Sequence, residues 1–332
     1  SLLVGSFFLL TGCGKPKFHT MTGNTMGTTY HVTAQFADKK IAEADLKAQI
    51  DARLESINQS MSTYKTDSEI TQFNQMKVGE KLTVSNDFVN VYTIAQRIYE
   101  ETDGAFDPTV STLVDLWGFG GGSDQSVDKK PPSDADIKAA LKNVGFDQVV
   151  LKDNELSKTA PVTLDFSAIA KGYGVDQVAE LLRNLHINSF LVEVGGEIVA
   201  DGMSPRAGPW RVAVTTPKSL NNAISRLELK DAALATSGNY RNYFDYEGVR
   251  YSHTINPNTG YPVKHELSSV TVIQPTSAEA DAYATALLVM GVEKGFNFAK
   301  EKDLPVYMIY SDGKAFDLKY TDMMKDYFPK HQ

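Results

Sequence analysis

The stretch VTLDFSAIAKGYG, residues 162–174, decides the fold because it changes from a strand-like to a helical pattern within a few residues. Val162–Phe166 alternates apolar and polar side chains as a strand does. The segment after it carries apolar residues at helical spacing: Val175, Val178, Leu181, Leu182 and Leu185. The sequence therefore predicts a strand that runs through a turn of small residues into a helix.

Lys171 stands at the start of this predicted helix, where the helix dipole disfavours a cation. Small side chains let a ligand approach the backbone closely, and the first amides of a helix favour an anion. A phosphate partner would resolve the conflict. The alternative is a surface lysine beside a satisfied helix cap.

Strand and helix patterns continue on both sides of this stretch. Helices are expected over Leu46–Met61, Phe88–Tyr99, from the capping residue Ser133 to near Gly145, and over Ser277–Met290 after a capping box at Thr276 and Glu279. Strands are expected over Thr28–Phe36, Phe190–Val194, Ile198–Ala200, Trp210–Thr215, Val270–Ile273 and Val306–Tyr310, with a hairpin turning at Glu247-Gly248. The breaker-rich Gly118–Pro132 is expected to be a surface loop rather than a domain boundary. Helices mixed with largely antiparallel strands indicate the α+β class.

Composition excludes several kinds of protein. The chain has 332 residues with 33 Lys and Arg against 41 Asp and Glu, so its formal net charge is −8. An acidic chain has no general attraction for polyphosphate, and we therefore expect no nucleic acid as a partner. A single cysteine excludes an internal disulfide framework and any site with several thiolates.

That cysteine ends the N-terminal stretch SLLVGSFFLLTGC. Leu2–Leu10 is too short to span a bilayer and is typical of the apolar part of a secretory signal. Leu10-Thr11-Gly12-Cys13 resembles a bacterial lipobox, in which cleavage precedes the cysteine and acyl chains anchor it. The alternative is a short buried helix or strand with an incidental cysteine. We expect residues 1–12 to be a truncated signal peptide and residues 13–20 to be a lipid-anchored tether.

Three further clusters combine side chains that can carry chemistry. Asp107 stands before Pro108, which favours an extended backbone, and the simple alternative is an Asx turn. His253 follows the expected hairpin and precedes an Asn-Pro turn, where it is either a base or ligand contact or a structural histidine. Asp281 and Thr285 are four residues apart on one helix face, and both are hard oxygen ligands that suit Mg²⁺. The alternative for Asp281 is an acid that complements the helix dipole.

Familiar nucleotide and hydrolase motifs are absent from the sequence. Gly313-Lys314 is followed by Ala315, so there is no P-loop, and no G-x-G-x-x-G, H-E-x-x-H or G-x-S-x-G pattern occurs in a suitable context. A bound nucleotide would have to be held in another way.

Nine segments, in this order, resemble the FAD:protein FMN transferase (ApbE) family. They are Thr25–Thr28, Ser62–Tyr64, Asp103–Pro108, Leu116–Gly120, Asp165–Gly172, Val194–Gly196, Thr236–Gly238, His253–Gly260 and Glu279–Thr285. The resemblance spans about Met21–Met290, and we expect residues 21–332 to form the catalytic domain. It implies one large α+β domain of two lobes, with largely antiparallel sheets, flanking helices and the flavin between the lobes.

The resemblance also implies the roles of individual residues. FAD contacts are expected at Met26, Tyr64, Ala105, Phe106, Asp107, Asp165, Lys171, His253 and Ile255. A Mg²⁺ ion would lie between the carbonyl of Ala168 and the side chains of Asp281 and Thr285, so Asp281 is also a catalytic residue. Ala284 stands where some relatives carry a second carboxylate. His253 is the candidate to accept a proton.

The implied reaction moves FMN from FAD to a Thr (or Ser) hydroxyl of an acceptor flavoprotein and releases AMP. The expected partners are subunits of membrane redox complexes such as the sodium-translocating NADH:quinone reductase. The expected location is the periplasmic side of the membrane, through the lipid anchor at Cys13, in the inner membrane of a Gram-negative bacterium. Two alternatives are an FAD pyrophosphatase that yields FMN and AMP, and a lipid-anchored FAD-binding protein without activity.

Overall fold

A computed structural model describes residues 17–37, 40–120, 129–216, 219–239, 243–264, 266–311 and 315–330, with only the backbone at 215, 216 and 219–224. The expected lipobox with Cys13, and most of the loop expected over Gly118–Pro132, lie outside these residues.

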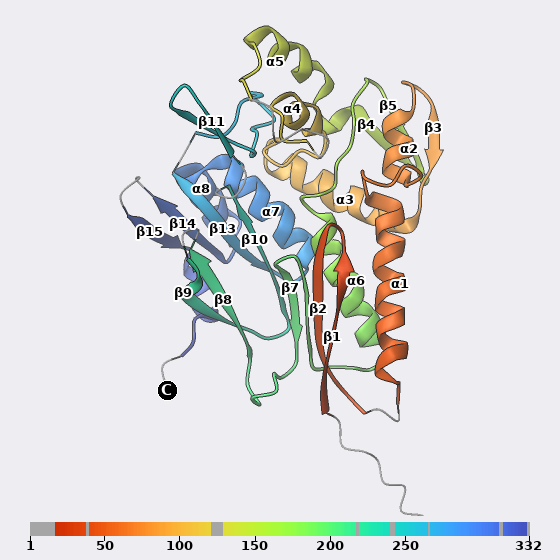
Figure 1. Cartoon of the computed structure of the whole chain (residues 1–332), viewed down its shortest axis with the longest axis vertical. Helices are drawn as coiled ribbons and strands as arrows, with labels where there is room; N and C mark the ends of the chain where they lie inside the picture. Colours follow the sequence, from red (N-terminus) through yellow and green to blue (C-terminus); the bar gives the residue numbers. More distant parts are fainter. Residues whose placement is uncertain are drawn as a thin grey trace, which may run out of the picture.

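An eight-stranded antiparallel sheet forms the centre of the molecule (Figure 1). Its strands, in spatial order, are β1 (Lys17–Thr25), β2 (Thr28–Phe36), β6 (Phe190–Val194), β7 (Glu197–Asp201), β10 (Ala232–Gly238), β13 (Leu267–Gln274), β14 (Val306–Ser311) and β15 (Phe316–Tyr320). Since β1 begins at Lys17, residues 17–20 belong to the sheet and not to the expected tether.

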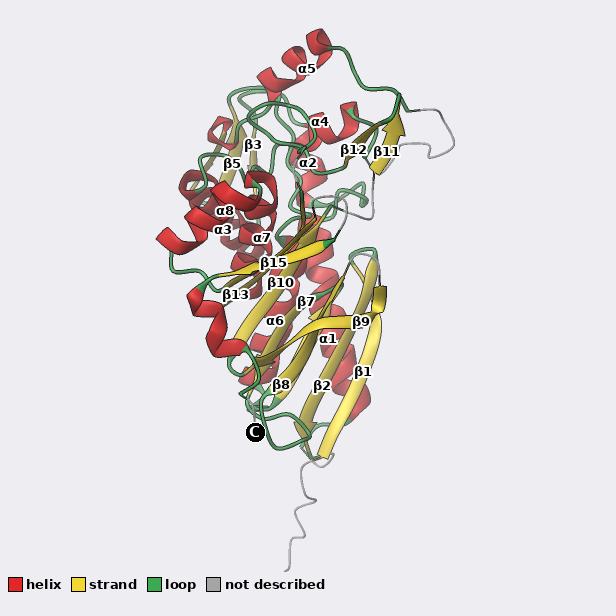
Figure 2. Cartoon of the chain, turned by 90° about the vertical axis from the view of Figure 1, so that its left-hand side faces the viewer, coloured by secondary structure: helices red, strands yellow, loops and turns green. Residues whose placement is uncertain are grey.

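Helices cover one face of this sheet, and a hairpin covers the other (Figure 2). The helices that contact the sheet are α1 (Glu43–Met61), α6 (Ala170–Asn184), α7 (Ser277–Met290) and α8 (Val292–Glu301). The other helices are α2 (Glu69–Gln75), α3 (Asn86–Glu101), α4 (Ser111–Leu116) and α5 (Asp134–Ala140), with 3₁₀ turns at Leu141–Asn143, Phe146–Gln148 and Asp322–Tyr327. Side chains alternate between the faces: Val199 and Ala233 pack in the cluster with α1 and α6, whereas Ala200 and Leu234 pack against the hairpin of β8 (Trp210–Thr216) and β9 (Ser219–Leu229).

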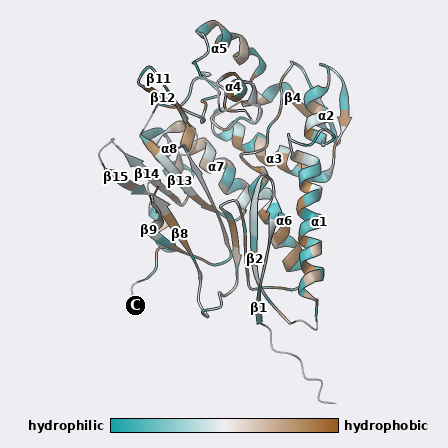
Figure 3. Ribbon diagram, viewed as in Figure 1, coloured by the Kyte–Doolittle hydropathy of each residue, from teal (hydrophilic) through white to brown (hydrophobic). Residues whose placement is uncertain are grey.

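Two small sheets complete the fold. One contains β3 (Lys81–Thr83), β5 (Glu155–Lys158) and β4 (Val149–Lys152), and the other contains β11 (Tyr243–Tyr246) and β12 (Val249–Ser252). Figure 3 shows hydrophilic and hydrophobic residues alternating along α1, which buries Leu46, Ile50, Leu54 and Ile57. The α+β prediction is confirmed, and so are the expected hairpin at Glu247-Gly248 and the capping of α7 by Thr276.

The expected strand over Val162–Phe166 is wrong. Val162, Leu164 and Phe166 are fully buried, so the alternation is real, but the segment pairs with no strand among the described residues. Side chains and a loop carbonyl bond its backbone instead. The amide of Asn74 donates to the carbonyl of Leu164 at 2.9 Å, and Asn74 Oδ1 accepts from the Leu164 N–H at 2.7 Å. The Lys158 ammonium donates to the carbonyl of Val162 at 3.1 Å, and the Asp165 N–H donates to the carbonyl of Pro108 at 2.8 Å. Periodicity reports which side chains are buried, not what satisfies the backbone.

The starts of α6 and α7 lie in unusually close contact. A Cβ at Gly172 would lie 2.3 Å from the carbonyl oxygen of Ser277, so this approach requires glycine. Asp176 of α6 accepts hydrogen bonds from the backbone N–H groups of Ser277 and Ala278, at 2.7 and 2.9 Å. A side chain of one helix therefore satisfies the first amides of the other.

We expect Gly172→Ala to lower the free energy of unfolding by about 1–3 kcal/mol, because the new methyl group must push the two helices apart. Gly208→Ala is the matched control, since a Cβ at Gly208 would meet nothing within 4 Å. Urea unfolding of both variants checks this prediction. Equal stability of the two variants would show that α7 can shift without cost.

Candidate functional site

Two adjoining cavities bring the predicted site residues together. The first, here called the acidic cavity, has a volume of about 340 Å³ and is lined by residues that include Ala105, Phe106, Asp107, Asp165, Ala168, Lys171, Glu197, Ser237, His253, Ile255, Asp281 and Thr285. The second, here called the Tyr64 cavity, has a volume of about 510 Å³ and is lined by residues that include Met26, Met61, Tyr64 and Ala170. Asp165, Ser167 and Lys171 line both. Every predicted ligand, metal and catalytic residue except Cys13, for which the expected role was lipidation, thus lines one of these cavities.

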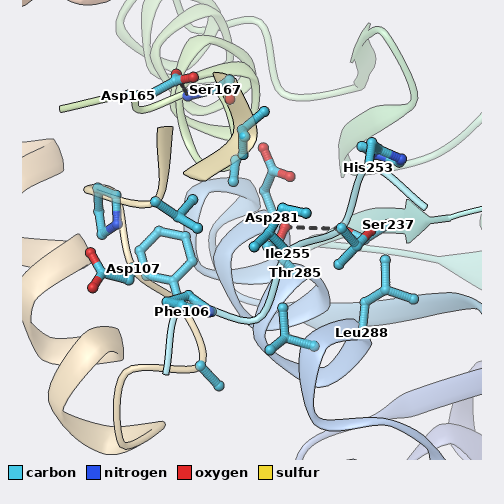
Figure 4. A pocket seen from close by; sticks show the side chains of 18 of the residues that line it. Phe106, Asp107, Asp165, Ser167, Ser237, His253, Ile255, Asp281, Thr285 and Leu288 are labelled. Atoms are coloured by element: carbon cyan, nitrogen blue, oxygen red, sulfur yellow. Dashed lines mark hydrogen bonds between the residues drawn. The ribbon is translucent and has the colours of Figure 1, made fainter. Parts of the chain in front are cut away.

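Asp281 and Thr285 lie one turn apart on α7 and face the same space (Figure 4). The hydroxyl of Thr285 lies 3.1 Å from the hydroxyl of Ser237 on β10. Asp281 is only 2% exposed, and its Oδ2 accepts from the backbone N–H of Gly172 at 3.3 Å. The Asp281 carboxylate, the Thr285 hydroxyl and Ala168 therefore line one cavity, and the metal that the resemblance implies there stays a prediction.

Lys171 contacts two carboxylates from different elements. Its Nζ lies 2.9 Å from Oε1 of Glu197 on β7 and 3.7 Å from Oδ2 of Asp281. Burial opposes the charge of Lys171, but Asp281 and Glu197 outweigh burial and hold the pKa of Lys171 above its ordinary value. Two carboxyl groups therefore offset the unfavourable interaction between Lys171 and the helix dipole. From the sequence alone, a phosphate was one candidate for this partner.

Burial dominates the behaviour of the two carboxyl groups. Burial and the neighbouring charge of Asp281 raise the pKa of Glu197 to about 8, although Lys171 opposes the shift. Burial likewise raises the pKa of Asp281, against Lys171 and the Gly172 amide. Glu197 was missed by the sequence analysis; the signal was its place directly after Gly195-Gly196, a segment singled out only up to the glycines.

The acidic cavity is closed on another side by the loop that carries Phe106 and Asp107. Asp107 Oδ1 accepts from the backbone N–H and the hydroxyl of Thr109, at 2.7 and 2.6 Å, which is the Asx turn considered as the simple alternative. Asp165 Oδ1 accepts from the Ser167 N–H at 2.8 Å in the same way. Both carboxyl groups therefore shape local turns and also line the cavity.

The segment after β12 supplies His253 and Ile255. Ile255 is buried and pairs with Pro262 in an isolated bridge, which fixes this segment beside the cavity. The ring of His253 meets Phe119 edge to face, with centroids 6.4 Å apart. His253 is partly exposed at the rim of the cavity, where an incoming group can reach it.

The Tyr64 cavity lies between the end of α1 and the β1–β2 turn. Met26 occupies this turn with a positive φ of 49°, followed by Gly27 at 71°. Tyr64 is 82% exposed, so its aromatic ring is open to a ligand. An exposed aromatic side chain beside an apolar cavity is typical of a binding surface.

The donor set for a metal ion is small. Within the described ranges, no group of three or more His, Cys, Asp or Glu side chains converges to hold a metal ion. The donors present are hard oxygens, namely carboxylate, hydroxyl and backbone carbonyl, which fit Mg²⁺ when substrate phosphates complete its coordination.

Asp107 provides a pH-dependent test of this geometry. Burial raises its pKa from about 3.8 to about 6, against the Thr109 hydrogen bonds. The folded state therefore holds the proton more tightly, and stability present below pH 4 is lost as the pH rises to 6. The unfolding free energy of the wild type, minus that of Asp107→Asn, should fall by about 2–3 kcal/mol between pH 4 and pH 7. Urea titrations at four pH values measure it; a pH-independent difference would contradict the burial of this carboxyl group.

Two adjoining cavities lined by buried acids, one ammonium group and an exposed aromatic ring are typical of a small-molecule binding site. Comparison with known proteins identifies the family of the chain. The ApbE family model matches residues 26–308. The FAD:protein FMN transferase of Vibrio cholerae is 40% identical over 98% of both chains, and that of Haemophilus influenzae is 39% identical over 95% of this chain and 93% of its own length.

Solved structures agree with these sequence matches. The flavin transferase ApbE from Vibrio cholerae aligns with a TM-score of 0.86 and 37% identity, over 94% of this chain and all of that chain. The apo flavinyl transferase ApbE of Pseudomonas stutzeri aligns with a TM-score of 0.88 and 34% identity, over 96% of this chain and 99% of that chain. The chain therefore belongs to the ApbE family.

Proposed function

We propose that this protein transfers FMN from FAD to a Thr (or Ser) hydroxyl of an acceptor flavoprotein and releases AMP. The observation that carries the proposal is the convergence of all the predicted donor-site residues on two adjoining cavities that share Asp165 and Lys171. Membership of a family whose relatives bear the name of this activity supports it.

FAD would occupy both cavities. The open ring of Tyr64 offers an aromatic face to one ring system, and Phe106 lines the other cavity. Lys171, shared by both, is placed to contact the pyrophosphate between them. The acidic net charge of the chain is no obstacle, since local positive charge decides the binding of a small anion.

Mg²⁺ would be held by Asp281, Thr285 and the carbonyl of Ala168, and the fit is supported by the hard oxygen donors gathered at this cavity. When bound, the ion neutralises charge on the pyrophosphate. The protein's own residues position the reactants: α7 presents the carboxylate and hydroxyl, and Gly172 keeps α6 close enough for Lys171 to reach the same space.

His253 is our candidate for the general base. The acceptor hydroxyl oxygen forms a bond to the flavin-side phosphorus, the bond from this phosphorus to the bridging oxygen breaks, and AMP leaves. His253 at the cavity rim would take the hydroxyl proton.

Two other functions predict different outcomes from transfer. An FAD pyrophosphatase would release FMN without an acceptor, at a rate that matches the transfer rate. A simple FAD carrier would bind flavin and leave it intact after long incubation with metal and acceptor. The Asp281/Thr285 pair favours an enzyme, because mere binding does not require it.

Covalent flavin on the acceptor is the direct readout. The chain is incubated with FAD, Mg²⁺ and a purified acceptor domain, and in-gel fluorescence is recorded after denaturation. We expect Asp281→Ala and His253→Ala to lower the labelling rate by about 10²-fold or more, and excess chelator to abolish labelling.

Glu279→Gln is the matched control on α7, because Glu279 pairs with Arg97 outside the acidic cavity. This variant should keep wild-type labelling. Undiminished labelling by Asp281→Ala, or in excess chelator, would overturn the metal assignment. Undiminished labelling by His253→Ala would overturn its role as base.

We also propose that Cys13 carries a lipid anchor, so that the domain faces the periplasm from the inner membrane of a Gram-negative bacterium. The order of apolar run, small residues and cysteine supports this. Among the described residues, no helix combines the length and apolar character needed to cross a bilayer. The acceptors would then be subunits of membrane redox complexes, such as the sodium-translocating NADH:quinone reductase.

A fusion of the chain to a complete signal sequence tests the anchor in a bacterial host. Metabolic labelling with a radioactive fatty acid should mark the wild type, and Cys13→Ser should be unlabelled and leave the membrane fraction, because the thiol that accepts the acyl chains is gone. Membrane retention of Cys13→Ser would refute the anchor.

A further inference from the structure

Glu197 is a buried carboxylate that is only half satisfied. It begins β7, directly after the Gly195-Gly196 turn, lines the acidic cavity and is 2% exposed. Its Oε1 contacts Lys171 at 2.9 Å. Its Oε2 has no hydrogen-bond partner in the part of the chain that the structure describes. Leaving a buried carboxylate oxygen unpaired is costly, so its presence beside a cavity points to a ligand.

The charges around Glu197 do not balance. Lys171 is the cation that contacts both Glu197 and Asp281, and it lies nearer to Glu197 by 0.8 Å, from distances of 2.9 and 3.7 Å. Ionising both carboxyl groups beside one ammonium would leave a net negative charge in a buried space, and burial accordingly raises the pKa of both groups. A cation with higher charge would complete this cluster, and carboxylate oxygens are the donors that hard divalent ions prefer.

The two carboxylates come from different layers of the fold. Glu197 is carried by the sheet and Asp281 by α7, and both line one cavity with the Thr285 hydroxyl. The Lys171 ammonium contacts both carboxyl groups, so it occupies the kind of position that a metal ion bound by the same two groups would occupy.

We propose that Glu197 is a second carboxylate ligand of the divalent cation, and that Lys171 takes the place of the cation until the cation binds. The proposal rests on the metal requirement stated under the proposed function and adds a ligand from the sheet to the donors on α7 and at Ala168. Binding of the cation releases the ammonium of Lys171 from its two acids. With a divalent cation on the two carboxylates and the ammonium of Lys171 beside them, the cluster carries a net positive charge, which favours an incoming pyrophosphate.

Direct binding of Mn²⁺, followed by the loss of the free-ion electron paramagnetic resonance signal, tests this without any reaction. The purified chain is titrated without FAD and with saturating FAD, and never with acceptor. Glu197→Gln should weaken Mn²⁺ binding by about 10–100-fold. Glu197→Asp, which keeps the charge but shortens the side chain, should weaken it by a smaller factor.

Two further variants separate a ligand from a structural role. Glu193→Gln is the matched control, since Glu193 lies on the neighbouring strand β6 and bonds His31 and the Gly196 amide outside the acidic cavity. It should bind Mn²⁺ as the wild type does. Lys171→Met should bind Mn²⁺ more tightly than the wild type without FAD, because the competing ammonium is removed. If the substitutions acted only by disturbing the structure, both Glu197→Gln and Lys171→Met would bind Mn²⁺ more weakly than the wild type.

The outcomes separate this inference from the proposed function. Mn²⁺ binding that is equal in the wild type and Glu197→Gln, with flavin transfer intact in the wild type, overturns the role of Glu197 alone. No Mn²⁺ binding by the wild type, with or without FAD, overturns both this inference and the metal requirement. Circular dichroism establishes folding; if Glu197→Gln is unfolded, undiminished affinity of Glu197→Asp overturns the proposal.

Discussion

The close crossing of α6 and α7 is the constraint on which the site depends. Gly172 removes the side chain that would hold the helices apart, and Asp176 replaces the missing amide partners at the start of α7. The same crossing places the Gly172 amide within hydrogen-bond distance of Asp281. A structural contact and a functional contact thus share one backbone segment, so neither can change without the other.

Burial makes the charged cluster at this crossing responsive to ligands. Desolvation raises the pKa of Glu197 and Asp281, and Lys171 only partly compensates. In water such a cluster would contribute little, but in a partly closed cavity each added charge counts for much more. A cation bound beside these two carboxyl groups would therefore change the local potential far more than the same cation at an exposed surface.

Local patterns predicted those elements whose hydrogen bonds are local. Helix α7 has the expected bounds, Ser277–Met290, because its capping residue Thr276 and its run of helix-forming residues are adjacent in the sequence. Strand β6 likewise has the expected bounds, since one face of alternating side chains is fully buried. The spacing of four placed Asp281 and Thr285 on one helix face, but only the resemblance to a known family implied a metal there, and that role stays a prediction.

Features that depend on distant partners escaped the sequence. Val162–Phe166 looks like a strand, yet Asn74 satisfies its backbone from far away in the chain. Strand β10 was not expected, because Thr236–Gly238 has little apolar alternation and gains its pairing from β7 and β13. The place of Glu197 after Gly195-Gly196 was its single local signal, and only the fold brings it to Lys171.

The β1–β2 hairpin sets a distance as well as a shape. Strand β1 has 9 residues and ends at the turn where Met26 lines the Tyr64 cavity, so the cavity lies about 30 Å from the start of the strand. Three residues separate Cys13 from Lys17, which limits their Cα separation to about 14 Å. Figure 1 shows the chain entering β1 at the end of the molecule opposite to α4 and α5. An anchor at Cys13 would make the hairpin a rigid standoff, and an acceptor would have to present its hydroxyl at a fixed height above the membrane.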